Sequence, residues 1–227
     1  MENLQNKIRK YWIDTPELFS ERYGFSVFNL LSPTKAFLHS RRKKVLSLVG
    51  NLKGKQILDV GCGSGIFMID FIEMGAKVIG VDYSNKMLDL AKKELLKSKI
   101  PASRFQLKKA NAVSLPFKDK KFDVILASGL TDYLTMSENK KFIKEASRVL
   151  KKNGTLIVSY PIKESPVAFL RSGIGLWLRK KFLGLPPLTT SLSIFDIKSL
   201  LDEAGLKDTQ HRKVFYTMWI IKAKRKN

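Results

Sequence analysis

The chain has 227 residues, 44% of them hydrophobic, which is enough apolar material for one α/β domain with a sizeable core. Its single cysteine, Cys62, excludes an intramolecular disulfide framework and a zinc cluster built from cysteines. No apolar secretory segment starts the chain, and no stretch reaches the roughly 18 uninterrupted apolar residues of a membrane-spanning helix. We therefore expect a cytoplasmic protein with, at most, a peripheral position at a membrane.

Positive charge is the unusual feature of the composition. The chain carries 42 basic and 20 acidic residues, a formal net charge of +22, and the excess is densest in residues 151–227. A field of this sign attracts RNA, anionic membrane surfaces or anionic substrates. However, lysine greatly outnumbers arginine and the charges alternate with apolar positions, which is equally typical of a proteome that places lysine on every solvated face. The charge alone leaves both interpretations open.

The first fifty residues are expected to form a helical cap. Thr15 and Ser32 each place a capping hydroxyl before a proline at the first helical position, and the second of these helices should end near Gly50. Aromatic side chains are frequent in this segment. We expect most of them to pack the helices onto a sheet.

From Gln56 onward, short apolar runs alternate with amphipathic segments of helix length, as in successive βα units. Strands are expected at residues 56–60, 77–81, 105–109, 122–127 and 155–160. Helices are expected between them at about residues 64–74, 86–97 and 138–150. This alternation predicts a parallel sheet with helices on both faces.

The C-terminal third departs from this alternation. The elements expected there are a helix over residues 166–182, a helix over about 195–204, and two strands over roughly 207–214 and 216–223. Two adjacent terminal strands can form only a hairpin, so the sheet should finish with an antiparallel strand. We expect one domain, 1–227, made of a cap (1–50), a core (51–160), an insertion (161–194), and a C-terminal helix and hairpin (195–227).

A glycine-rich turn follows the first expected strand. In Ile57–Gly65 a buried strand ends in three glycines at alternate positions, and such a turn lets backbone N–H groups and a helix N-terminus approach a ligand closely. The dinucleotide fingerprint would need a glycine where Ile66 stands, which weakens a nicotinamide or flavin hypothesis. Asp82, at the tip of the second strand, can accept hydrogen bonds from both hydroxyls of an adenosine ribose.

Five segments, in the right order and at the right intervals, resemble the successive motifs of class I S-adenosylmethionine-dependent methyltransferases. They are Ile57–Gly65, Asp82–Ser84, Ala110–Phe117, Phe122–Ile125 and Arg148–Leu156. The motif region, with Leu115-Pro116-Phe117, is similar to the small-molecule, quinone-biosynthesis-like branch. The resemblance implies an enzyme with S-adenosylmethionine as cofactor, no metal, and an α/β, Rossmann-like, doubly wound, seven-stranded sheet that is mostly parallel.

The resemblance also implies which residues bind the cofactor. They are Asp59, Gly61, Cys62, Gly63, Gly65, Asp82, Tyr83, Met87, Asn111, Ala112 and Ser128. Asp59 and the glycine turn would hold the methionine end and Asp82 the ribose, while Tyr83 and Met87 would line the adenine. Asn111 and the backbone of Ala112 would meet the adenine amino side, and Ser128 would lie beside the sulfonium. Many family members have aspartate where Asn111 stands, so an altered contact is expected there.

The sulfonium makes the methyl group reactive, so the protein chiefly aligns nucleophile, methyl and sulfur in a dry pocket. A general base is optional, and the candidates are Asp132, Tyr133, Tyr160, Tyr23 and His39. For each of these we expect a structural role before a catalytic one. Cys62 is expected to be a small packing residue. Residues 127–130 lack the Asn/Asp-Pro-Pro-aromatic signature of enzymes that methylate adenine or glutamine amino groups.

The insertion combines apolar residues with a basic flank, which suits an amphiphilic acceptor near an anionic bilayer, such as a lipid, a quinone precursor or a tetrapyrrole. The same segment is also explained by a lid helix that packs on the core. Two other hypotheses are an RNA methyltransferase that uses its basic surface and a partner protein that binds the cofactor without turnover. RNA ranks lower, because no RNA-binding module stands beside the core. The methyl acceptor and the oligomeric state stay open.

Overall fold

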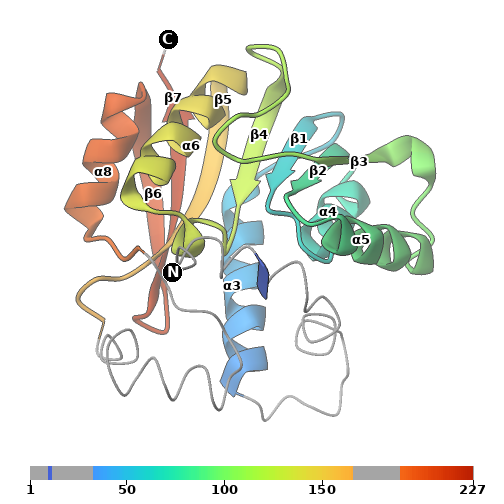
Figure 1. The fold of residues 1–227 in the computed structure, drawn as a ribbon, viewed down its shortest axis with the longest axis horizontal. Helices are drawn as coiled ribbons and strands as arrows, with labels where there is room; N and C mark the ends of the chain where they lie inside the picture. Colours follow the sequence, from blue (N-terminus) through green and yellow to red (C-terminus); the bar gives the residue numbers. More distant parts are fainter. Residues whose placement is uncertain (1–9, 12–32, 166–189, 227) are drawn as a thin grey trace.

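The computed structural model describes residues 10–11, 33–165 and 190–226, which form a layered α/β structure around one seven-stranded sheet (Figure 1). The spatial order of the strands is β3-β2-β1-β4-β5-β7-β6. Their bounds are Gln56–Val60 (β1), Lys77–Asp82 (β2), Phe105–Lys109 (β3), Phe122–Ala127 (β4), Leu150–Pro161 (β5), Leu206–Val214 (β6) and Met218–Arg225 (β7). Strands β1 to β5 pair in parallel, and β7 is antiparallel to both of its neighbours. The predicted fold class is confirmed.

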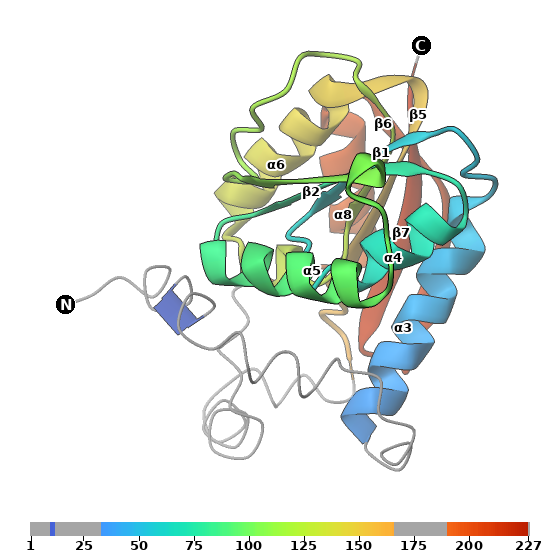
Figure 2. The ribbon, with the colours of Figure 1, turned by 90° about the vertical axis from the view of Figure 1, so that its right-hand side faces the viewer.

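Helices cover both faces of the sheet. They are α3 (Pro33–Val49), α4 (Ile66–Glu73), α5 (Asn85–Lys97), α6 (Met136–Val149) and α8 (Ile194–Glu203). Alternate strand residues point to opposite faces, so Leu58 packs with α6 and α8, whereas its neighbour Ile57 packs with α3, α4 and α5. Figure 2 shows α6 and α3 on opposite sides of the sheet. The core is therefore two apolar layers divided by the sheet.

Side-chain caps decide where several helices begin. Thr135 and Glu138 form a reciprocal capping box at the start of α6, and Ser193 and Asp196 form another at the start of α8. Each box satisfies two backbone N–H groups that the first helical turn leaves without partners. These helices begin one or two residues earlier than expected, because the cap lies upstream of the apolar pattern.

Other expected boundaries were displaced as well; the strand expected over residues 216–223, for example, is β7 and begins at Met218, after the turn at Phe215 and Tyr216. The helix expected from residue 64 begins at Ile66, since Gly65 has a φ of 77° and lies outside the helical conformation. The fifth strand begins at Leu150, which pairs with Phe122 before the register shifts along β4. The expected helix over residues 166–182 and the cap before residue 33 lie outside the described residues, apart from 10–11. The division of the chain into cap, core and insertion stays a prediction.

The sheet reverses its order between β1 and β4, because β2 and β3 lie on one side of β1 while β4 and β5 lie on the other. Ligands of open α/β sheets bind in the crevice beyond the carboxyl ends of the strands at this switch point. We call the end of the sheet where β1, β2, β4 and β5 finish the carboxyl edge. Along the described stretches, no helix is long and apolar enough to cross a membrane.

Candidate cofactor site

The glycine turn lies at the carboxyl edge, between β1 and α4. Gly61, Gly63 and Gly65 all have a positive φ, of 71°, 53° and 77°. A side chain would also be crowded here, because a Cβ on Gly61 would lie 3.3 Å from Leu130 and one on Gly65 would lie 3.2 Å from Cβ of Ala91. Both the backbone conformation and the packing therefore require glycine at these positions.

Asp82 fixes the geometry of this turn from the end of β2. The N–H of Gly63 donates to its Oδ2 at 3.0 Å, and the N–H of Ser84 donates to its Oδ1 at 2.9 Å. Burial raises the pKa of Asp82, and the backbone donors oppose that effect. The N–H of Tyr83 is a third backbone donor to this carboxylate, which has about four lone-pair sites in total and so can still accept a further hydrogen bond. This position at the end of β2 fits a carboxylate that accepts from a ribose hydroxyl.

Asp59 is a buried carboxyl with an unsatisfied oxygen. The residue is 2% exposed, and its Oδ2 has no hydrogen-bond partner within residues 10–11, 33–165 and 190–226. Burial, followed by repulsion from Asp82, raises the pKa of Asp59 to about 8. Such a group is costly unless it is paired, and an ammonium group would supply the missing donor. The ammonium of the methionine end of S-adenosylmethionine has this chemistry.

Ser128 and Gly129 extend the site just beyond β4. The Oγ of Ser128 is buried and has no hydrogen-bond partner in the described parts of the chain. The N–H of Gly129 donates to the Oγ of Ser159 at 2.8 Å, which joins the end of β4 to β5. Together with Asp59, Ser128 gives this edge two polar atoms that a bound cofactor would satisfy.

Arg41 is a cation of this site that the sequence analysis did not single out. It comes from α3 and is 7% exposed, and a Cβ on Gly129 would lie 2.8 Å from its Nη1. Its neighbour Arg42 pairs with Asp70, with a distance of 2.7 Å between Nε and Oδ2. A usable signal was present, since Arg41 shares the helical spacing of the buried residues Val45 and Leu48. The run of basic residues concealed it.

The adenine side is formed by the loop after β3. The N–H of Ala110 donates to the carbonyl of Asp82 at 3.0 Å, so the loop begins beside the ribose carboxylate. The Oδ1 of Asn111 accepts from the N–H of Val113 at 3.2 Å, and Ala112 is buried. Tyr83 is 45% exposed, whereas Met87 is only 2% exposed. This places Tyr83 at the surface of the site and Met87 beneath it.

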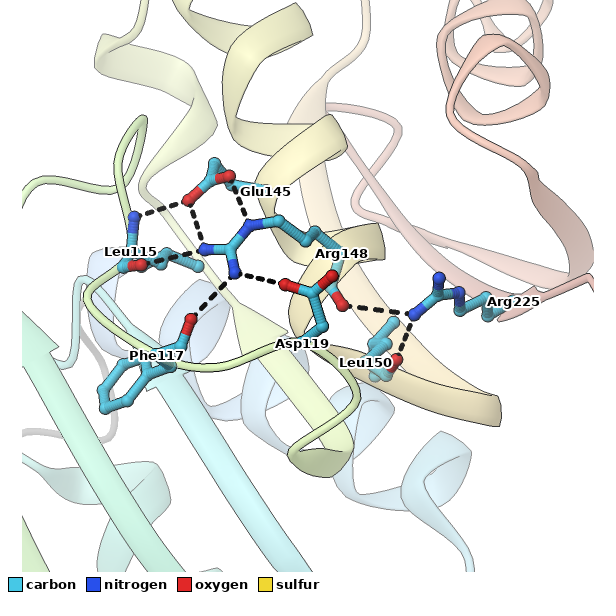
Figure 3. Close-up of polar contacts among 7 residues, drawn as sticks. All are labelled: Leu115, Phe117, Asp119, Glu145, Arg148, Leu150 and Arg225. Carbon is cyan, nitrogen blue, oxygen red and sulfur yellow. Dashed lines mark hydrogen bonds and ion pairs between the residues drawn. The ribbon is translucent and has the colours of Figure 1, made fainter.

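Arg148 of α6 binds the continuation of this loop, residues 115–119, through hydrogen bonds and ion pairs (Figure 3). Its guanidinium donates to both oxygens of Glu145 at 2.8 Å and to Asp119 at 2.7 Å. It also donates to the carbonyls of Phe117 and Leu115 at 2.8 and 2.9 Å. One guanidinium therefore ties together both ends of residues 115–119, and through them it positions the loop that carries Asn111 and Ala112.

The catalytic candidates are scattered. Tyr160 is fully buried, and its hydroxyl donates to Oδ1 of Asn139 at 3.2 Å. Burial raises the pKa of Tyr160, so its position favours a structural role. Asp132 is 6% exposed on a single turn after β4 that also includes the half-buried Tyr133. His39 is exposed on α3, and Tyr23 lies outside the described residues. Asp132 and Tyr133 lie at the carboxyl edge on the turn after β4, and Tyr160 lies near the same edge as the residue before the last of β5, where its side chain is fully buried.

Burial also bears on Cys62, whose thiol pKa it raises, so the side chain is a packing residue of the turn and not a ready thiolate nucleophile. Among the residues with described positions, no cluster of three or more His, Cys, Asp or Glu side chains could hold a metal ion.

Known proteins show the same pattern of sequence and fold. Residues 58–158 match the model of a family described as a methyltransferase domain. The chain is 31% identical over 191 residues to a demethylmenaquinone methyltransferase of Bacillus licheniformis, covering 75% of this chain and 78% of that protein. It is 31% identical over 154 residues to a ubiquinone biosynthesis O-methyltransferase of Pelagibacter ubique, covering 68% of this chain but only 61% of that protein.

The fold has a close counterpart among solved structures. Magnesium protoporphyrin IX methyltransferase from Synechocystis PCC 6803, with bound S-adenosylhomocysteine, superimposes with a TM-score of 0.75 at 23% identity, covering 98% of this chain and 100% of that one. The family model, the relatives and the fold agree with the glycine turn and the two aspartates at the switch point. This chain belongs to the class I S-adenosylmethionine-dependent methyltransferases.

Proposed function

We propose that this protein transfers a methyl group from S-adenosylmethionine to a small-molecule or amphiphilic acceptor, such as a lipid, a quinone precursor or a tetrapyrrole. The observation that carries the proposal is the buried carboxyl of Asp59, with an unsatisfied oxygen, one strand away from the ribose-type carboxylate of Asp82. Relatives named for quinone methylation and a structural neighbour named for tetrapyrrole methylation support this acceptor class.

The cofactor side of the mechanism follows from charge. Asp59 would accept from the ammonium of the methionine end, and Arg41 would attract its carboxylate, since the guanidinium lies beside Gly129 at the same edge. Asp82 would accept from the ribose hydroxyls. Ser128 would lie beside the sulfonium. When bound, the cofactor supplies an already activated methyl group, so these residues need only hold it in place.

The acceptor side requires alignment and exclusion of water. A nucleophile that enters from the carboxyl edge must reach the methyl group in line with the sulfur. Asp132 is the best-placed group to receive a proton, because its carboxyl is buried at this edge, where its Oδ1 lies 3.3 Å from the Oγ of Thr131. The hydroxyl of Thr131 also contacts the carbonyl of Ser159, which fixes the turn against β5.

The test is a binding titration followed by a transfer assay. Calorimetry with S-adenosylhomocysteine should give micromolar affinity, and NAD should not bind. Asp82→Asn should weaken binding about 10- to 100-fold because a charged hydrogen-bond acceptor is lost. The matched control is Asp89→Asn, an exposed aspartate on α5, which should bind as the wild type does.

Transfer of a radioactive methyl group should then be measured with lipid extracts, soluble metabolites and RNA as separate acceptors. Labelling of the lipid or metabolite fraction supports the proposal. Labelling of RNA alone would replace the acceptor class. Tight NAD binding would overturn the proposal altogether, and cofactor binding without transfer to any fraction would support a partner protein without turnover.

A further inference from the structure

The turn between β6 and β7 presents two aromatic side chains to solvent. The N–H of Thr217 donates to the carbonyl of Val214 at 2.9 Å, which closes a tight turn over Phe215 and Tyr216. Their side chains are 58% and 69% exposed. We call these two residues the hairpin tip. The ring centroid of Phe215 lies 6.4 Å from that of Phe37 on α3. Despite this contact, more than half of the Phe215 surface stays exposed.

The backbone of the hairpin tip is strained for these residue types. Phe215 and Tyr216 have φ values of 44° and 55°. Two consecutive positive φ angles are typical of a type I′ turn, in which asparagine and glycine are strongly preferred because side chains with a bulky Cβ are crowded there. Asn-Gly at these two positions would give the hairpin turn less backbone strain. Residues that cost strain and expose apolar area point to a contact outside the described residues.

Two basic residues, Arg212 and Lys213, lie next to the hairpin tip on β6. The Nζ of Lys213 lies 4.7 Å from the ring centroid of Trp219 and 5.7 Å from that of Tyr216. Arg212 is exposed beside it, and β6 has no acidic residue between Asp208 and the tip. The aromatic rings thus occupy the tip of the hairpin, and the basic residues Arg212 and Lys213 precede them on β6. This order matches a bilayer interface, where aromatic residues lie at headgroup depth and basic residues contact anionic lipid.

The hairpin tip lies at the same edge as the cofactor site. Met218 pairs with Pro161, the last residue of β5, so the turn projects beyond the carboxyl ends of the parallel strands. Figure 1 shows this turn at the lower end of the sheet, past the arrowhead of β4.

Other exposed apolar side chains gather at the same edge. Within the described residues the large exposed hydrophobic side chains that lie there are Tyr83, Met136, Phe195, Phe215 and Tyr216. Met74 and Leu96, which end α4 and α5, lie at the opposite edge. The apolar exposure of the protein is therefore concentrated where an acceptor would have to enter.

We propose that the hairpin tip docks into the headgroup region of an anionic lipid bilayer and brings the carboxyl edge against the membrane. An amphiphilic acceptor could then pass from the bilayer into the site without crossing water, a consequence that rests on the proposed function. Docking itself does not. Single-stranded RNA would also match aromatic and basic groups, but stacking platforms track a strand along a groove, whereas these rings stand at a projecting turn.

The test is co-sedimentation of the full-length protein with large unilamellar vesicles, without cofactor. Vesicles of phosphatidylcholine alone are compared with vesicles in which about one third of the lipid is phosphatidylglycerol. We expect binding to the anionic vesicles that weakens with salt. The double variant Phe215→Asn/Tyr216→Gly should bind them at least about tenfold more weakly, while its Tm is unchanged or higher because Asn-Gly suits the turn.

Two further variants separate the contributions. Arg212→Gln and Lys213→Gln should each weaken binding to anionic vesicles about fivefold. The matched control is Leu96→Ser, which removes an exposed apolar side chain from the opposite edge and should bind as the wild type does.

Equal binding by the Asn-Gly variant and the wild type would overturn the proposal, as would retention of the protein by single-stranded RNA but not by vesicles. The Asn-Gly variant should also bind S-adenosylhomocysteine with unchanged affinity. Failure of docking and failure of the proposed function are thus measured separately.

Discussion

Binding of the cofactor should release a proton from Asp59. Because burial raises the pKa of this carboxyl to about 8, about nine tenths of it is protonated near pH 7 in the free protein. The ammonium of the cofactor favours the ionised form, so the proton must leave as the pair forms. Allowing for the cofactor amine, whose own pKa is about 8, we expect net release of about 0.8 protons near pH 7.

The same equilibrium determines how affinity depends on pH. Between about pH 6 and pH 8 the ionised fraction of Asp59 rises about 50-fold, while the charged fraction of the amine falls about twofold. The association constant for S-adenosylhomocysteine should therefore rise about 25-fold over this range. In Asp59→Asn both the proton release and this rise should disappear, and affinity near pH 8 should fall about 10- to 100-fold.

The stability of the free protein should change in the opposite direction. The pKa of Asp59 is higher in the folded chain, so the folded state binds more protons between about pH 4 and pH 8, and the free energy of unfolding falls as the pH rises through that window. Each pH unit costs at most about 1.4 kcal/mol. Asp59→Asn should reduce this decline and be more stable than the wild type by about 1–3 kcal/mol near pH 8.

Isothermal titration in buffers of different ionisation enthalpy measures the released protons directly, and urea denaturation at several pH values measures the stability. Asp89→Asn serves as the control. Release of fewer than about 0.2 protons would refute the reasoning, because Asp59 would then be ionised before binding or protonated after it.

Three further variants probe the surroundings of the site. Gly80→Ala should lower the free energy of unfolding by about 1–3 kcal/mol in urea denaturation, because the new Cβ would collide with the Sδ of Met68; an unchanged midpoint would show that Met68 moves aside. Arg148→Lys should weaken S-adenosylhomocysteine binding severalfold in calorimetry, since an ammonium cannot reach all the partners of the guanidinium. Equal affinity would show that the loop held by Arg148 does not contribute to cofactor binding. Tyr160→Phe should lose about 1 kcal/mol of stability through Asn139 but retain methyl transfer, whereas loss of turnover in a folded variant would assign Tyr160 a catalytic role.

Much of the fold could be predicted from local patterns. The strands β1, β3 and β4 begin and end where the apolar runs do, and α3 begins at the Ser32-Pro33 signal. Boundaries that depend on pairing partners could not be predicted in this way. β5 extends back to Leu150 because that residue pairs with Phe122, and the apolar pattern of a single segment contains no information about its partner.

The sequence by itself determined the order of βα units, the glycine turn and the acid at the tip of the second strand, since each depends on periodicity or backbone conformation within a few neighbouring residues. Only the tertiary structure decided which side chains are buried and what they face. Arg41 reaches Gly129, Asp59 loses contact with water, and the hairpin tip arrives at the carboxyl edge, through contacts between segments far apart in the chain. Burial and charge depend on that packing, and they supply the chemistry of the site.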